Sequence, residues 1–149
     1  MSRLRVEKQA VPATFYLADG SSLEGHFFLA PFSPARRGPQ TVEDLMVEPG
    51  WVLPFSAADG SFLLLGKHRV AAVAVPLRDH RPSGFWTPVP VRIRLSGPHE
   101  IEGGLLVEEG LGDRLSDFLK SSEAWLALET RDSLFWVSKD HLVSLRSSP

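Results

Sequence analysis

Apolar and polar residues alternate with a period of two near the start of the chain. Residues 13–17 and 23–29 both show this pattern, and Asp19 and Gly20 stand between them. A period of two is typical of a β-strand that buries one face. Asp-Gly is a pair that tight hairpin turns favour, because both residues tolerate positive φ. The pattern therefore predicts an antiparallel hairpin.

The next part of the chain changes from a short helical segment back to strands. Residues 41–47 (TVEDLMV) predict one or two helical turns, with Thr41 as N-cap and Asp44 as the acid three residues later. Strand character, rich in β-branched and aromatic residues, then returns in three segments. These are residues 51–55, 62–65 and 70–75. We expect about five strands, with a short helix between the second and the third.

This whole pattern occurs twice in the chain. Residues 11–30 align with residues 89–108, and the alignment continues to the C-terminal region with two short deletions. Among the matched residues are Val11 with Val89, Gly25 with Gly103, Trp51 with Trp125, Ser61 with Ser133, and Lys67 with Lys139. The self-similarity indicates two copies of one unit of roughly 60 to 65 residues. The predicted division is an N-terminal segment (1–10), repeat 1 (11–76), a linker (77–88) and repeat 2 (89–149).

Two glycines give the expected sheet its curvature. Gly25 and Gly103 lie inside predicted strands, where a missing side chain marks a bulge or a sharp bend. Short antiparallel strands that bend in this way favour a small closed or half-closed barrel over a βαβ unit. We expect a mainly β protein with two tandem small barrels, each with a short helix between strands two and three. One larger barrel that shares strands of both copies is the alternative.

Composition and charge exclude several classes of function. The chain has 149 residues, no cysteine, and 16 basic against 18 acidic side chains, for a net charge of −2. Without cysteine there is no disulfide or thiolate metal site, which fits a reducing compartment. The near-neutral charge lacks the positive field that dominates non-specific nucleic-acid binding. The charged N-terminal segment and the absence of a long apolar run predict a cytoplasmic protein that does not enter membranes.

Motifs for catalysis and for metal or cofactor binding are not found. The five histidines lack HxxH or HExxH spacing, and no GxSxG sequence occurs. Residues 60–67 (GSFLLLGK) superficially resemble a phosphate loop, but the glycine spacing is too long and His68 stands where Ser or Thr must hold magnesium. We expect no enzyme activity, no metal and no cofactor.

The tryptophans differ in whether they repeat. Trp51 and Trp125 occur at the same point of each copy and are expected to fill the core of each barrel. Trp86 and Trp136 have no counterpart, which makes them the candidate partner-binding residues. Trp136 should face opposite to its neighbours in a strand, and contact with the other copy is favoured over a ligand platform.

Residues 63–73 (LLLGKHRVAAV) resemble the Sm2 segment of Sm-like proteins, in particular the bacterial RNA-chaperone type. In that family a strand ends in a Lys-His pair, and an apolar residue two positions later opens the last strand; here these are Lys67, His68 and Val70. Residues 15–29 are similar to the Sm1 hairpin of the same family. The resemblance implies barrels of Sm-like or SH3-like type.

The resemblance also implies contact with single-stranded RNA at Lys67 and His68, and at Lys139 in the second copy. The second copy departs from the pattern, because Asp140 replaces the histidine. The connection through residues 31–50 is longer than in the family, and two units are fused. Since edges and grooves of small barrels suit peptide recognition, we expect a binding or scaffolding module for a protein or peptide partner. The alternative is an Sm-like RNA-binding protein. A unit of this size is marginal alone, so the copies should pack together or form a homo-oligomer.

Overall fold

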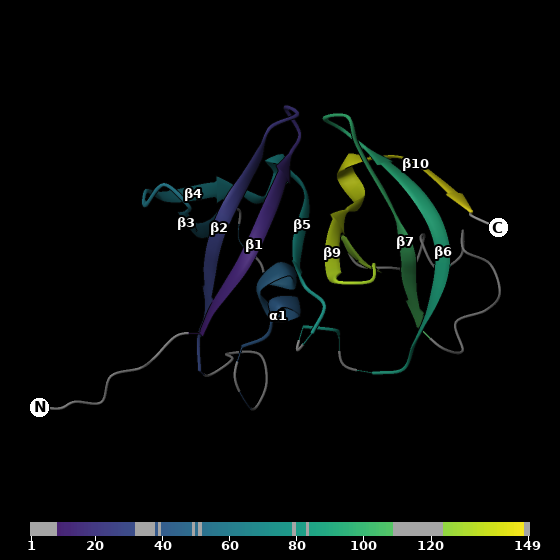
Figure 1. Ribbon diagram of the computed structural model, residues 1–149, viewed down its shortest axis with the longest axis horizontal. Helices are drawn as coiled ribbons and strands as arrows, with labels where there is room; N and C mark the ends of the chain where they lie inside the picture. The colour runs from purple at the N-terminus through teal and green to yellow at the C-terminus, as the bar shows by residue number, and fades with distance from the viewer. Residues whose placement is uncertain are drawn as a thin grey trace, which may run out of the picture.

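The computed structural model describes residues 9–31, 38, 40–48, 50, 52–78, 80–82, 84–108 and 124–147. These residues form one antiparallel sheet of ten strands and one short α-helix (Figure 1). The mainly β class and the number of strands agree with the prediction. None of the helices in this described part of the chain is long and apolar enough to cross a membrane.

The elements fall into two units with the same order along the chain. The first unit comprises β1 (Gln9–Leu17), β2 (Ser22–Leu29), α1 (Val42–Val47), β3 (Val52–Ala57), β4 (Phe62–Gly66), the 3₁₀ turn η1 (Lys67–Arg69) and β5 (Val70–Pro76). The second unit comprises β6 (Trp86–Leu95), β7 (His99–Glu108), β8 (Trp125–Glu129), β9 (Ser133–Ser138), η2 (Lys139–His141) and β10 (Leu142–Ser147). The helix predicted for the second copy and Trp51 lie outside the described residues.

The two units also agree in the pairing of their strands. The order is β5-β1-β2-β3-β4 in the first and β10-β6-β7-β8-β9 in the second. The last strand of each unit carries a bulge at the same place, because the pairing with β1 skips Ala71 and the pairing with β6 skips Val143. The duplication seen in the sequence is therefore also present in the backbone.

The two units are joined by an antiparallel pair between β5 and β9, in which Val73 lies opposite Trp136. This pairing makes one continuous sheet whose end strands, β4 and β10, lie at opposite sides of the molecule (Figure 1). The sequence predicted two tandem barrels, but the structure has one open sheet, so separate closed barrels are not confirmed. The outer edge of β5 pairs with the other unit and is not available to close a barrel with β4 of its own unit.

A close approach of β3 to β2 shapes the first unit. Phe15 and Phe55 are buried and their rings meet edge to face, 4.6 Å between centroids. A Cβ at Gly25 would overlap the Ser56 carbonyl oxygen and lie 2.6 Å from the Phe55 ring. At Gly103 a Cβ would lie 2.6 Å from the carbonyl oxygen of Glu129. The two glycines thus permit backbone contacts that no side chain could accommodate. The sequence predicted a bulge or bend here, but the register of β1 with β2 and of β6 with β7 runs through both glycines without a shift.

Helix α1 begins with the predicted capping box. The Thr41 hydroxyl accepts the Asp44 N–H at 3.1 Å, and the Asp44 carboxylate accepts the Thr41 N–H at 2.9 Å. Val42 and Met46 are buried in the core of the first unit. The cap and these two apolar residues fix the short helix on this core, and Leu45 of the helix lines the groove described next.

Candidate protein-binding surface

The outer edge of β4 carries exposed apolar side chains. Phe62 is 65% and Leu64 is 64% exposed, and β4 pairs only with β3 in the described sheet. Their counterparts in the second unit are Leu134 and Trp136, which are 0% and 3% exposed. Leu134 and Trp136 pack in the apolar cluster of the first unit, which β5 joins to the outer edge of β9, whereas no described strand pairs with the outer edge of β4. We name Phe62 and Leu64, together with the free backbone edge of β4, the β4 edge.

A groove of about 520 Å³ lies beside the β4 edge. Its described lining comes from β2, α1, β3, β4 and η1 and from the connections between them. It consists of Phe27, Phe28, Gln40, Leu45, Glu48, Gly50, Val52, Pro54, Phe62 and Lys67. Phe28 is 45% exposed there. Gln40 is held in place by two hydrogen bonds with the backbone of Ala30, at 3.0 and 2.9 Å. The groove thus combines an apolar floor with a few polar groups, which is typical of a binding site.

Lys67 fastens the C-terminal end of α1 to the end of β4. Its Nζ donates to the carbonyl oxygen of Glu48 at 2.6 Å and to that of Leu45 at 3.1 Å. Burial lowers the pKa of Lys67, and the charge of the Glu48 side chain partly opposes this effect. The last turn of α1 has no basic residue of its own. Lys67 therefore supplies the cation that the terminal carbonyl groups of the helix favour.

The structure brings the three residues of the RNA hypothesis, Lys67, His68 and Lys139, only partly together. Lys67 and His68 border a cavity of about 310 Å³ between the units, but Asp140 borders it too and adds a negative charge. The backbone carbonyl of His68 accepts a hydrogen bond from His141 Nε2 at 2.5 Å, while the His68 side chain is exposed. Lys139 is half-buried, is not among the described lining residues, and has an interaction partner.

The two candidate tryptophans are largely covered by the chain itself. Trp136 packs among core residues of the first unit, as the sequence favoured, and lies between the two units. Its indole Nε1 has no hydrogen-bond partner among the described residues. Trp86 is half-buried at the start of β6 and packs against the apolar clusters of both units. The adjacent Phe85 is exposed.

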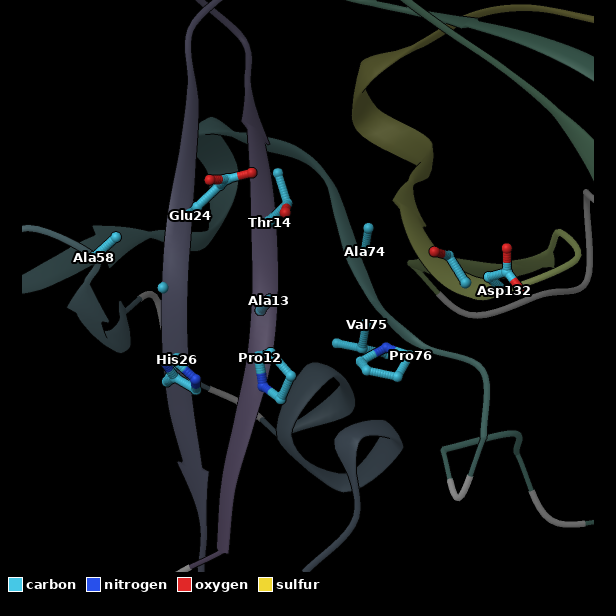
Figure 2. Close-up of a pocket in the computed structure, with 12 residues that line it drawn as sticks. Pro12, Ala13, Thr14, Glu24, His26, Ala58, Ala74, Val75, Pro76 and Asp132 are labelled. Carbon is cyan, nitrogen blue, oxygen red and sulfur yellow. The ribbon is translucent and has the colours of Figure 1, made fainter.

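A further pocket of about 430 Å³ lies on the outer face of β1, β2 and β5, and Figure 2 shows its lining. Glu24 and His26 reach it from β2, and Asp132 reaches it from the turn before β9. Among the described residues, no group of three or more His, Cys, Asp or Glu side chains lies close enough to hold a metal ion. The pocket thus presents dispersed polar groups around apolar residues such as Pro12 and Val75.

Comparison of the chain with protein-family models, curated proteins and solved structures finds no match. The resemblance to Sm-like proteins therefore rests on the sequence of residues 15–29 and 63–73 alone.

Phe62 and Leu64 were not singled out from the sequence, although a signal is present. Residues 62–65 (FLLL) are apolar at every position, whereas a strand with one solvent-facing side alternates. A run of this kind predicts a strand covered on both faces. The structure leaves part of it uncovered, and this mismatch makes the β4 edge a candidate binding surface.

Proposed function

We propose that this protein is a non-enzymatic binding module that takes a protein partner by strand addition at the β4 edge. The observation that carries the proposal is the exposure of Phe62 and Leu64, since their counterparts in β9 are buried against the first unit, which pairs with β9 through β5. In strand addition, the partner's backbone completes the ladder of hydrogen bonds, and alternate side chains give specificity. An unprotected, apolar edge is otherwise a liability that proteins avoid.

The groove beside β4 supports this mode of binding. An extended segment paired with β4 places every second side chain on the same face. Phe28 is half-exposed in the groove, so an apolar side chain of the partner gains contact area there. Glu48 and Lys67 form part of the polar rim. We infer a partner segment that is extended and apolar at alternate positions.

We infer that the two units are tandem modules of the Sm-like or SH3-like small-barrel type suggested by the sequence. The strand order and the bulge that the two units share support a common module. RNA binding is less favoured because the Nζ of Lys67 is engaged with α1 and because Asp140 borders the same cavity.

Selection of displayed peptides tests the proposal. The wild-type protein should enrich extended peptides with apolar residues at alternate positions, and Leu64→Lys should abolish their binding. Val143→Lys is the matched control, because it places the same charge on an exposed apolar residue of the opposite edge strand, and it should retain binding. Peptide binding should respond weakly to salt. Peptides that bind Leu64→Lys as well as wild type would refute the β4 edge as the site.

A parallel measurement addresses RNA. Fluorescence anisotropy with a short single-stranded RNA should show negligible binding at physiological salt, as expected for a protein of net charge −2. Submicromolar RNA binding that falls steeply with salt and disappears in the Lys67→Ala/His68→Ala double variant would overturn the ranking.

A further inference from the structure

The proposed function leaves the partner open, and the following inference rests on that function. We propose that the partner of the β4 edge is β10 of a second copy of this chain, so that copies join head to tail. The joint between the two units inside the chain is the template. There, the fourth strand of one unit, β9, pairs antiparallel with the fifth strand of the other, β5.

The correspondence between the two repeats predicts which residues would pair at a joint between chains. Within the chain, Ala72 lies opposite Val137, Val73 opposite Trp136, Ala74 opposite Phe135, and Val75 opposite Leu134. Replacing each residue by its repeat counterpart places Ser144 opposite Leu65, Leu145 opposite Leu64, Arg146 opposite Leu63, and Ser147 opposite Phe62 of the next copy. The counterpart of Arg146 is Ala74, which is only half-buried at the joint, so there is space for a longer side chain at the surface.

Residues that are buried at the internal joint have exposed counterparts on the free edge strands β4 and β10. Ala71, the bulged residue of β5, is 0% exposed and belongs to the apolar cluster of the second unit. Its counterpart Val143 is 60% exposed. Phe62 and Leu64 differ from their buried counterparts in the same way. Six large apolar side chains are exposed among the described residues, and three of them, Phe62, Leu64 and Val143, lie on the two end strands.

Charges at the ends of these strands are complementary. At the internal joint, the side chain of His141 donates to the backbone carbonyl of His68. The repeat counterparts are Arg69 for His141 and Asp140 for His68. Both side chains are exposed in the single chain. At a head-to-tail joint, Arg69 of one copy reaches the position of Asp140 on the next, which adds an ion pair that the internal joint does not have.

A symmetric pair of β4 strands fits the structure less well. It would leave β10 and Val143 uncovered, and it would not reproduce the pairing of a fourth with a fifth strand. A head-to-tail contact uses two different surfaces of the same chain. Such contacts generate a closed ring when the rotation between copies closes, and a filament when it does not.

Native mass spectrometry and light scattering after size exclusion test the proposal with two edge variants. Wild type should form species at multiples of 16.4 kDa. Leu64→Arg disables the β4 edge and Val143→Arg disables β10, so each alone should be monomeric. An equimolar mixture should form dimers with one copy of each variant, because one edge of each variant remains intact. Thr87→Arg, an exposed position on β6, is the control and should assemble like wild type.

A charge exchange gives a second measurement. Arg69→Asp and Asp140→Arg should each weaken assembly at least tenfold, and combining them in one chain should restore it. Circular dichroism should show that all variants keep the β spectrum of wild type. Restoration by the exchange would support the register, and failure to restore would refute it.

Other outcomes overturn the proposal. Wild type that stays monomeric at about 100 μM refutes it, since even weak specific interfaces of standard size reach micromolar affinity. If that monomer still binds the selected peptides at the β4 edge, the inferred partner is wrong while the proposed function stands. If it binds none, both fail. Dimers of Val143→Arg alone would instead indicate symmetric β4 pairing.

Discussion

Replacing Lys67 by methionine tests whether this residue is a structural cap or a site for phosphate. Methionine keeps most of the aliphatic stem and removes the ammonium group, so the lost interactions are mainly those of Nζ. Two of these are hydrogen bonds from a charged donor, 2.6 Å to the Glu48 carbonyl and 3.1 Å to the Leu45 carbonyl. Hydrogen bonds to a charged group contribute about 1.5–3 kcal/mol when buried. Partial exposure of Lys67 reduces this, so we expect a total loss of about 2 kcal/mol.

Urea unfolding followed by circular dichroism measures this loss. With a slope of about 2 kcal/mol per molar urea, Lys67→Met should lower the midpoint by about 1 M without a change in slope. The melting temperature should fall by about 4–8 °C. His68→Ala is the control, because this exposed neighbour should change stability by less than about 0.5 kcal/mol. If Lys67→Met proves as stable as His68→Ala, Lys67 does not cap α1. The hypothesis that Lys67 contacts an RNA phosphate would then be favoured.

Three further predictions concern the scaffold. Gly25→Ala should destabilise by about 3 kcal/mol and Gly103→Ala by less, because a Cβ at Gly25 meets the backbone more closely; equal melting temperatures for Gly25→Ala and wild type would contradict the close approach. Trp136→Phe removes an unpartnered buried donor and should cost under about 1.5 kcal/mol, whereas Trp136→Ala should cost about 3–5 kcal/mol in urea unfolding; a small loss in Trp136→Ala would show that the ring is not part of the core. The hydroxyl and N–H of Ser61 hold the pKa of Asp59 below 3.8, so the contribution of the Asp59 carboxylate to stability is present above pH 3.8 and is lost as pH falls through the folded pKa. Carbon NMR titration should show the lowered pKa, with a smaller shift in Ser61→Ala, and a pKa at or above 3.8 would refute the argument.

Local patterns in the sequence were sufficient to predict the elements of each unit. The alternation around Phe15 indicated the buried face of β1, and Thr41 with Asp44 indicated where α1 begins. Gly25 was recognised as a special position inside a strand, but the close approach of β3 that requires a missing Cβ there was found only in the structure. These features depend on neighbouring residues or on one strand's own two faces, so the order of residues is enough to specify them.

The pairing between the units and the β4 edge could not be predicted in the same way. Alternation indicates which face of a strand is buried, but it does not identify the strand that lies beside it. A weaker signal was present in β5, whose residues VAAVAVP are all apolar, whereas its counterpart β10 reads LVSLRS. A wholly apolar strand is typical of the interior of a sheet, and a more polar one of its edge. The sequence also carried a weak signal for the role of Lys67, since a lysine follows the fourth strand in both copies.

The covalent link between the units changes what the β5–β9 joint must achieve. A short connection holds the two surfaces at an effective concentration in the millimolar range, so this joint closes even if its intrinsic affinity is low. A contact between separate chains has no such help and depends on how much protein the cell makes. A substitution that weakens the contact should therefore open the internal joint less readily than an equivalent substitution in β4 or β10 disrupts the proposed head-to-tail assembly, and expression level should control that assembly.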